Sequence, residues 1–396
     1  MLSEKEMKYN FDYAVHLNRW SMQLCGMWPI EDRFSKLRFF ITLIIMLCIT
    51  VPVMIKCFLL KNFFQEVEII FICINLISTI IKVLFMGISK PKLVPLIQDM
   101  IGDWKYTQLL SKEAKSVMII NSKRARFFNA LCIALLFAPF LLFITRPIIL
   151  NWGGEFTKKS LPCQAYYPFD VEKSPNYELV YLWQILLIAY TAIAAMGINT
   201  FITLIVFHLC GQLQVVALNI KDIMNPRNVC HYRSMIHQEC KCLHYIVERH
   251  LKLISDSKIL ENSFNIMFLM EVIITVISLC FVSFAVLVVS PAGDIYGTFI
   301  NIAYFFAPTI LIFLYNYIGE NVIDRSLDIG DEVYNINWYD CNPKFIQSLM
   351  LIIIRSQKPL KLTAGKFFPL SLHAFKKILI SALSYATVLL ASSRRH

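Results

Sequence analysis

The sequence is poor in charged residues. Only 16% of its 396 residues are Asp, Glu, Lys or Arg, whereas 57% are hydrophobic and the mean hydropathy is +0.58. A water-soluble chain of this length is about a quarter charged and about half apolar. The shortage of charge excludes an ordinary soluble domain and indicates that lipid surrounds most of the chain.

Motifs that carry catalysis are also missing from the sequence. It has no Gly-rich phosphate-binding loop, no nucleophile elbow and no helical pair of histidines with an intervening glutamate. No basic run is interleaved with a foldable soluble module, so the net charge of +11 does not indicate nucleic acid as a partner. We expect neither an enzyme nor a cofactor.

A secretory signal peptide is likewise not recognisable. The first 38 residues lack a basic start followed by a short apolar core and a small-residue cleavage site, so we expect the mature protein to begin at its own N-terminus. The twelve cysteines lie mostly in apolar segments or in loops expected in the cytosol, where thiols stay reduced. We interpret them as mostly free thiols, not as a disulfide scaffold.

Long apolar runs are what the sequence does contain. A transmembrane helix needs roughly 20 predominantly apolar residues. Seven runs are of about this length or longer: Phe39–Leu60, Ile69–Ile88, Phe127–Thr145, Leu179–His208, Asn262–Ser290, Gly297–Ile318 and Leu370–Ser392. The predicted fold class is therefore an all-α integral membrane protein with seven transmembrane helices. The fourth run continues in a polar helical pattern, and the apolar stretch Phe345–Ile354 is too short to span, so both predict helices in the cytoplasm.

Basic residues are distributed unequally between the two sides of the membrane. When alternate loops are assigned to the same side, that side holds 27 Lys and Arg residues and the other side holds 7. Cytoplasmic loops carry the excess of positive charge, which predicts a cytoplasmic N-terminus and an extracellular C-terminus. This orientation is the reverse of a G-protein-coupled receptor, so we expect no requirement for a G protein. The odd number of segments and the absence of an internal repeat disfavour a transporter built from two matched halves.

Ionisable residues inside the apolar runs are candidates for a functional role. Glu271 lies within the fifth run, and Lys82 lies near the cytoplasmic end of the second, where its side chain can also snorkel to the interface. The stretch His231–His250 is rich in His and Cys but lacks the paired spacings of a structural zinc module. We expect a packed, partly solvated helix there, with a zinc site as the alternative.

The outer halves of the second, third, fourth and sixth runs are rich in aromatic and aliphatic residues. Such a lining suits a small apolar ligand, to which a Tyr or Trp offers one directional hydrogen bond. The candidate ligand-binding residues are Ile69, Phe71, Ile72, Phe137, Phe140, Leu141, Ile144, Trp183, Leu187, Tyr190, Phe299, Tyr304 and Phe306. Contact with lipid or packing in the core is the alternative role for each of them.

The last run carries a stripe of polar and small residues. At helical steps of three or four, it consists of His373, Lys377, Ser381, Ser384, Val388 and Ala391. If several subunits place this stripe around an axis, it can line an ion path with Val388 as an apolar constriction. Small residues also serve helix packing, which is the alternative.

The C-terminal third carries a characteristic set of motifs. They are Tyr317-Ile-Gly-Glu320, Val333-Tyr334, Trp338-Tyr339, Arg355-Ser-Gln-Lys-Pro359, Leu362-Thr-Ala-Gly365, Pro369-Leu-Ser-Leu372 with Phe375, and Ser384-Tyr385. This pattern resembles the signature of insect odorant receptors. The opening Trp20…Leu24-Cys-Gly-Met-Trp-Pro29 is similar to that of many hymenopteran members.

The resemblance implies a heterotetrameric, ligand-gated cation channel in the plasma membrane of olfactory sensory neurons. A tuning subunit that binds a small volatile odorant assembles there with a common co-receptor. The resemblance places helices 1–6, with the odorant-binding region, in residues 1–316, and an anchor helix and the pore helix in residues 317–396. It puts the gate at Val388 and Ser392. The loop Lys221–Lys258 is shorter than its counterpart in the co-receptor, which favours a tuning subunit.

Two alternatives to an odorant receptor remain at this stage. A gustatory-type channel is the nearer one, although Ser384-Tyr385 and Ala391-Ser392 fit the final helix of that branch less well. A membrane transporter is the alternative from another class. Cation selectivity follows from the resemblance alone, because Lys376 and Lys377 near the inner mouth would by themselves repel cations.

Overall fold

Helices account for almost all of the regular structure. The computed structural model describes residues 15–30, 32–59, 67–106, 111–151, 161–223, 241–284 and 295–393. Its main helices are α2 (Ser35–Phe58), α3 (Val67–Tyr106), α4 (Lys112–Asn151), α5 (Asn176–Asp222), α7 (Lys241–Phe284), α8 (Ile295–Asn335), α9 (Pro343–Ser356) and α10 (Leu372–Ser393). A helix satisfies its backbone hydrogen bonds within its own segment, which a lipid environment requires.

Each of the seven predicted runs overlaps one of these helices. Five of them, α2, α3, α5, α7 and α8, are long and apolar enough within their described residues to cross a membrane, and α4 and α10 contain the two other predicted runs. The short apolar stretch predicted as a non-spanning helix is α9, which follows the 3-10 helix η3 (Trp338–Asp340). A two-stranded antiparallel sheet, β1 (Thr363–Ala364) and β2 (Phe368–Pro369), precedes α10.

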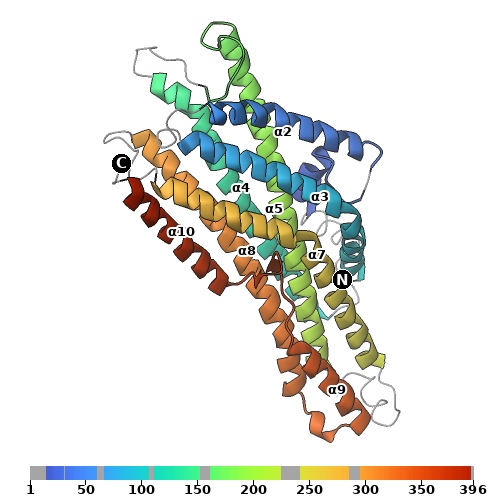
Figure 1. Ribbon diagram of the computed structural model, residues 1–396. Helices are drawn as coiled ribbons and strands as arrows, with labels where there is room; N and C mark the ends of the chain where they lie inside the picture. The colour runs from blue at the N-terminus through green and yellow to red at the C-terminus, as the bar shows by residue number, and fades with distance from the viewer. Residues whose placement is uncertain are drawn as a thin grey trace.

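Five of the helices are much longer than the apolar runs within them. Helices α3 and α4 have 40 residues each, α8 has 41, α7 has 44 and α5 has 47. A 40-residue helix is about 60 Å long, roughly twice the hydrocarbon thickness of a bilayer. Figure 1 shows α5, α7 and α8 continuing together to the end where α9 lies, while α10 lies against one side of the bundle. The predicted helical continuation of the fourth run is therefore confirmed.

Helix α5 forms the centre of the bundle. From Ala194 to Leu213 every residue except His208 is buried. A helix that is apolar all round must be enclosed by other elements, and here α3, α4, α7 and α8 all pack against it. Aromatic stacking joins α4, α5 and α8. The ring of Phe128 on α4 lies 5.2 Å from the rings of both Phe207 on α5 and Tyr317 on α8.

A charged network joins α3, α5 and α7 beyond their apolar runs. The Asp103 carboxylate lies 3.0 Å from Nε2 of His208 and 2.5 Å from the guanidinium of Arg249, which also donates to Gln212 (2.9 Å). Burial alone would raise the pKa of Asp103, but His208 and Arg249 hold it below its ordinary value. Three helices are thereby joined through one ionised carboxylate.

The turn before α2 depends on a glycine. Gly26 has a φ of +68°, and its carbonyl accepts hydrogen bonds from the Ser35 hydroxyl (3.0 Å) and the Lys90 ammonium (3.3 Å). A Cβ at this position would overlap the carbonyl oxygen of Ser35 and lie 2.6 Å from the backbone nitrogen of Phe39. Only glycine allows this conformation and this close approach.

We expect Gly26→Ala to lower the melting temperature of the detergent-purified protein, because the left-handed backbone alone costs an alanine about 1 kcal/mol and the overlap adds to it. Gly102→Ala is the matched control, since a Cβ there meets no atom within 4 Å. Alanine should be neutral or slightly stabilising in that helical position. Equal melting temperatures for the two variants would contradict this explanation of the turn.

Candidate ligand site and pore helix

Two of the predicted ligand-binding residues pack against each other. The rings of Phe71 on α3 and Tyr304 on α8 have centroids 4.3 Å apart, and both side chains are buried with Val282 of α7. Phe305 packs against this cluster. Helices α3, α7 and α8 therefore meet at an aromatic cluster in the half of the molecule where we predicted the ligand.

A second cluster joins α2, α3 and α5. Ile69 and Leu187 are buried in it with Ile49 and Val53, and Ile72 packs against it. The segment before α5 packs against this cluster through Cys163. The backbone N–H of Cys163 donates to the side-chain oxygen of Gln184 (2.9 Å), and the Gln184 amide donates to the Cys163 carbonyl (2.9 Å). The cluster brings Leu187 together with Ile69 and Ile72, which are more than a hundred positions earlier in the sequence.

The remaining candidate ligand-binding residues either contact neighbouring side chains and backbone groups or lie exposed on the surface. Phe137 and Phe140 form an edge-to-face pair with centroids 6.0 Å apart, and the carbonyl of Ile144 accepts from the Tyr181 hydroxyl (2.8 Å). The Tyr190 hydroxyl lies 2.8 Å from that of Thr42 and donates to the Leu24 carbonyl. Four residues are exposed on the single chain: Leu141, Trp183, Phe299 and Phe306.

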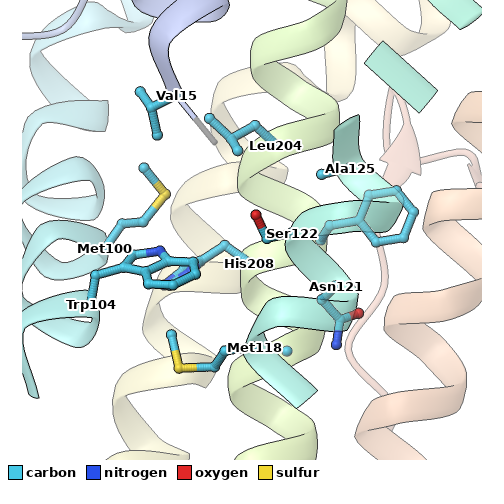
Figure 2. Close-up of a pocket in the computed structure, with 11 residues that line it drawn as sticks. Val15, Met100, Trp104, Met118, Asn121, Ser122, Ala125, Leu204 and His208 are labelled. Carbon is cyan, nitrogen blue, oxygen red and sulfur yellow. The ribbon is translucent and has the colours of Figure 1, made fainter. Parts of the chain in front are cut away.

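A small hollow lies away from these clusters, between the helix at residues 15–24, α3, α4 and α5. Figure 2 shows Met100 and Trp104 of α3 on one side of it, with Ser122 of α4 and His208 of α5 on the side that faces them. None of the predicted ligand-binding residues lines it. Sequence reasoning did not find this hollow because its lining comes from four separate segments, each with an ordinary helical pattern.

A neighbouring small hollow between α3, α5 and α7 has three acidic residues in its lining, Asp99, Asp103 and Asp256. Burial and the nearby carboxylate of Asp99 raise the pKa of Asp256 to about 6. Among the described residues, no group of three or more His, Cys, Asp and Glu is arranged to hold a metal ion. The first half of the His231–His250 stretch considered for zinc, residues 231–240, lies outside the described residues.

The two ionisable residues singled out inside the apolar runs form an ion pair. Lys82 Nζ on α3 lies 2.6 Å from a carboxylate oxygen of Glu271 on α7, and their side chains are only 9% and 7% exposed. Lys82 therefore points into the protein and does not snorkel to an interface. Each charge compensates the other where neither could be solvated by water.

Among its described side chains, helix α10 buries one narrow stripe. Ala374, Ile378, Ala382 and Ala386, at steps of four, are buried, and α10 packs against α7 and α8. The predicted pore stripe, of which His373, Lys377, Ser381, Ser384, Val388 and Ala391 are described, is exposed throughout. Of Ser392, the second predicted gate residue, the structure describes the helical backbone but not the side chain.

Comparison with known proteins identifies the family. The family model described as "7tm Odorant receptor" matches residues 62–383, which is most of the chain. The chain belongs to the odorant receptor family. It is accordingly a multi-pass membrane protein of olfaction, in a family that does not consist of enzymes.

Individual odorant receptors are similar to this chain at low identity. Odorant receptor 9a of Drosophila melanogaster is 23% identical over 290 residues, covering 71% of this chain and 68% of the relative, and Odorant receptor 94a of the same species is 22% identical over 381 residues, covering 93% and 95%. In the alignments with Odorant receptor 9a and three further receptors of this species, the chain spans 53–68% of the relative's length.

A solved structure has the same fold. The olfactory receptor OR5 from Machilis hrabei, in complex with eugenol, superimposes with a TM-score of 0.78 at 16% identity, over 98% of this chain and 99% of that one. The predicted membership of the insect odorant receptor family is confirmed.

We expect Glu271→Gln to destabilise the protein strongly, because it leaves the Lys82 ammonium buried without a counter-charge, at a cost of about 3–5 kcal/mol. The double variant Lys82→Met, Glu271→Met removes both charges and should recover most of the melting temperature and of the cell-surface amount. Lys252→Met is the control, because its pair with Asp99 is half exposed (43% and 32%) and contributes at most about 1 kcal/mol. A double variant no better than Glu271→Gln would contradict this account.

Proposed function

We propose that this chain is the odorant-specific, or tuning, subunit of a ligand-gated, non-selective cation channel that it forms with the odorant co-receptor. It binds a small, volatile, apolar odorant in the outer half of its transmembrane bundle. The N-terminus lies in the cytoplasm and the C-terminus outside, as the excess of basic residues on one side supports. The channel resides in the plasma membrane of olfactory sensory neurons.

The observation that carries this proposal is the uncovered face of α10 in a chain of the odorant receptor family. Serine and lysine side chains on a helix in a membrane need water or partner chains, and the single subunit leaves them exposed. Four subunits arranged around an axis would supply both the partner chains and the water of a central ion path. Val388, which is 66% exposed, is then the apolar constriction of the pore.

The odorant site is proposed at the Phe71–Tyr304–Val282 cluster and the adjoining cluster of Ile69 and Leu187. Both are apolar, and Tyr304 offers the ligand a hydrogen-bonding hydroxyl. The structural relative from Machilis hrabei was solved with eugenol, a small molecule. Exposed candidates such as Phe299 and Phe306 are proposed to face lipid or the neighbouring subunit.

The decisive experiment is whole-cell recording from cells that express this chain with and without the co-receptor, against a broad panel of volatiles. We expect an odorant-evoked cation current that requires both chains. Uptake of a substrate without current would instead indicate a transporter. A current carried by this chain alone would contradict its assignment as a tuning subunit.

We expect Tyr304→Ala and Phe71→Ala to raise the half-maximal odorant concentration by about tenfold or more, corresponding to a loss of about 1.4 kcal/mol in ligand binding. Phe306→Ala is the matched control, because this aromatic residue lies on the same helix but is 53% exposed. Its dose–response curve should stay close to that of the unmodified chain. Equal shifts for Phe306→Ala and Tyr304→Ala would place the ligand elsewhere.

A further inference from the structure

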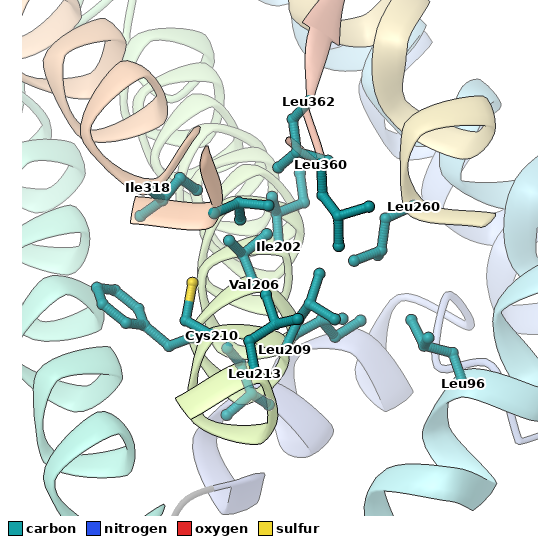
Figure 3. Packing of buried hydrophobic residues seen from close by; sticks show 14 of the residues in the cluster. Leu96, Ile202, Val206, Leu209, Cys210, Leu213, Leu260, Ile318, Leu360 and Leu362 are labelled. Atoms are coloured by element: carbon teal, nitrogen blue, oxygen red, sulfur yellow. The ribbon is translucent and has the colours of Figure 1, made fainter. Parts of the chain in front are cut away.

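The segment that connects α9 to α10 is bound to the helical bundle along its length. The backbone N–H of Leu360 donates to the Ser326 hydroxyl of α8 (2.9 Å), and that of Leu370 donates back to the Leu362 carbonyl (2.8 Å). Figure 3 shows the buried side chains of Leu360 and Leu362 between Ile318 of α8 and Leu260 of α7. The pore helix thus begins from an immobilised connector.

Helix α7 holds the first half of this connector through a carboxylate. One oxygen of Glu261 accepts from the backbone N–H of Thr363 (2.9 Å), and the other accepts from the Thr363 hydroxyl (2.5 Å). One turn further, the Asn265 carbonyl accepts from the N–H of Gly365 (2.8 Å). Gly365 has a φ of +61°, and a Cβ there would lie 2.5 Å from the Leu269 side chain, so the contact requires glycine.

Helix α8 binds the second half of the connector, at the N-terminus of α10. The Asn316 amide oxygen accepts from the N–H of Ser371 (3.0 Å), and the Glu320 carboxylate accepts from the N–H of Leu372 (3.1 Å). A carboxylate is favourable here because the first N–H groups of a helix have no partner within it and carry partial positive charge. A Cβ on Gly319 would lie 2.5 Å from the backbone oxygen of Leu370, so only glycine lets the two segments meet so closely.

The same two helices also contribute to the aromatic cluster at the opposite end of their apolar runs. Helix α7 carries Val282 in addition to Glu261, and α8 carries Tyr304 in addition to Glu320. Between Tyr304 and Glu320 lies Pro308, which has no backbone N–H to donate within the helix. Helices α7 and α8 therefore connect the aromatic cluster to the segment that precedes α10.

We propose that Glu261, Asn316 and Glu320 form a clamp that converts a relative movement of α7 and α8 into movement of the pore helix. They are positioning residues for gating, and they touch neither odorant nor permeating ion. The inference rests on the proposed function, in which α10 lines the pore. It assigns a physical role to contacts made by residues of the Tyr317–Glu320, Leu362–Gly365 and Pro369–Leu372 motifs.

The test compares odorant dose–response curves, spontaneous current and unitary conductance for clamp variants expressed with the co-receptor. We expect Glu261→Ala and Glu320→Ala to shift the half-maximal concentration or the spontaneous open probability by at least about fivefold, the lower end of ordinary coupling between sites. Unitary conductance and reversal potential should not change. Glu261→Gln and Glu320→Gln keep an acceptor oxygen and should recover most of the effect.

Matched controls remove exposed carboxylates from the same helices. Glu248→Ala on α7 and Asp331→Ala on α8 should behave as the unmodified chain, with all currents normalised to the amount at the cell surface. Variants of Glu261 and Glu320 indistinguishable from these controls would overturn the clamp. An altered unitary conductance would also overturn it, because the residues would then act on the ion path itself.

A milder variant keeps the proposal testable if the alanine variants fold poorly. Thr363→Val removes the hydroxyl that donates to Glu261 and keeps the shape of the side chain. It should shift gating in the same direction as Glu261→Ala, and gating like that of the unmodified chain would overturn the pairing. A lack of odorant-evoked current from the unmodified chain would overturn the proposed function itself, and a normal current with unaltered variants would overturn only the clamp.

Discussion

The burial of α5 on all sides is the constraint on which the rest of the structure depends. A helix whose residues from Ala194 to Leu213 are almost all inaccessible must be surrounded, and α3, α4, α7 and α8 surround it. Lipid tails are as apolar as leucine, so close packing and interhelical hydrogen bonds hold such a bundle together where it lies in a membrane. One of these is the bond of 2.6 Å from the buried Tyr315 hydroxyl of α8 to Asn199 of α5. Helix α10 is outside this arrangement, which leaves its exposed faces for partners.

The charged side chains buried between α3 and α7 lie next to groups of opposite charge. Within the apolar runs, Lys82 and Glu271 join α3 to α7, and further along the same two helices Asp103 joins Arg249 and His208. A buried ion pair adds little net stability because desolvation offsets the attraction, but an incorrect register would leave each charge unpaired at a cost of several kcal/mol. These pairs therefore fix how α3 and α7 align.

The sequence predicts the helices well because the length and polarity of a run are local properties. It also identifies Glu271 and Lys82 as unusual, since each is a charge within an apolar run. Their pairing could not be predicted, because it depends on how two helices far apart in the chain are rotated against each other. The same reason explains why Tyr304 is buried against Phe71 whereas Phe306, two positions later, is exposed. An aromatic run does not by itself reveal which residues face inwards.

The C-terminal motifs form a recognisable pattern in the sequence. The contacts of Glu320 and Gly319 with Leu372 and Leu370 give that pattern a physical basis.

The central claim, that α10 lines an odorant-gated ion path, is tested most directly by single cysteines on this helix. Ser384→Cys and Val388→Cys lie on its exposed stripe, and Ala386→Cys lies on the stripe buried against the bundle. With the co-receptor present, a charged thiol reagent applied with odorant should block the current through the first two variants, at rates that depend on odorant, and should spare Ala386→Cys and the unmodified chain. Block of Ala386→Cys alone, or of none of the variants, would contradict the claim.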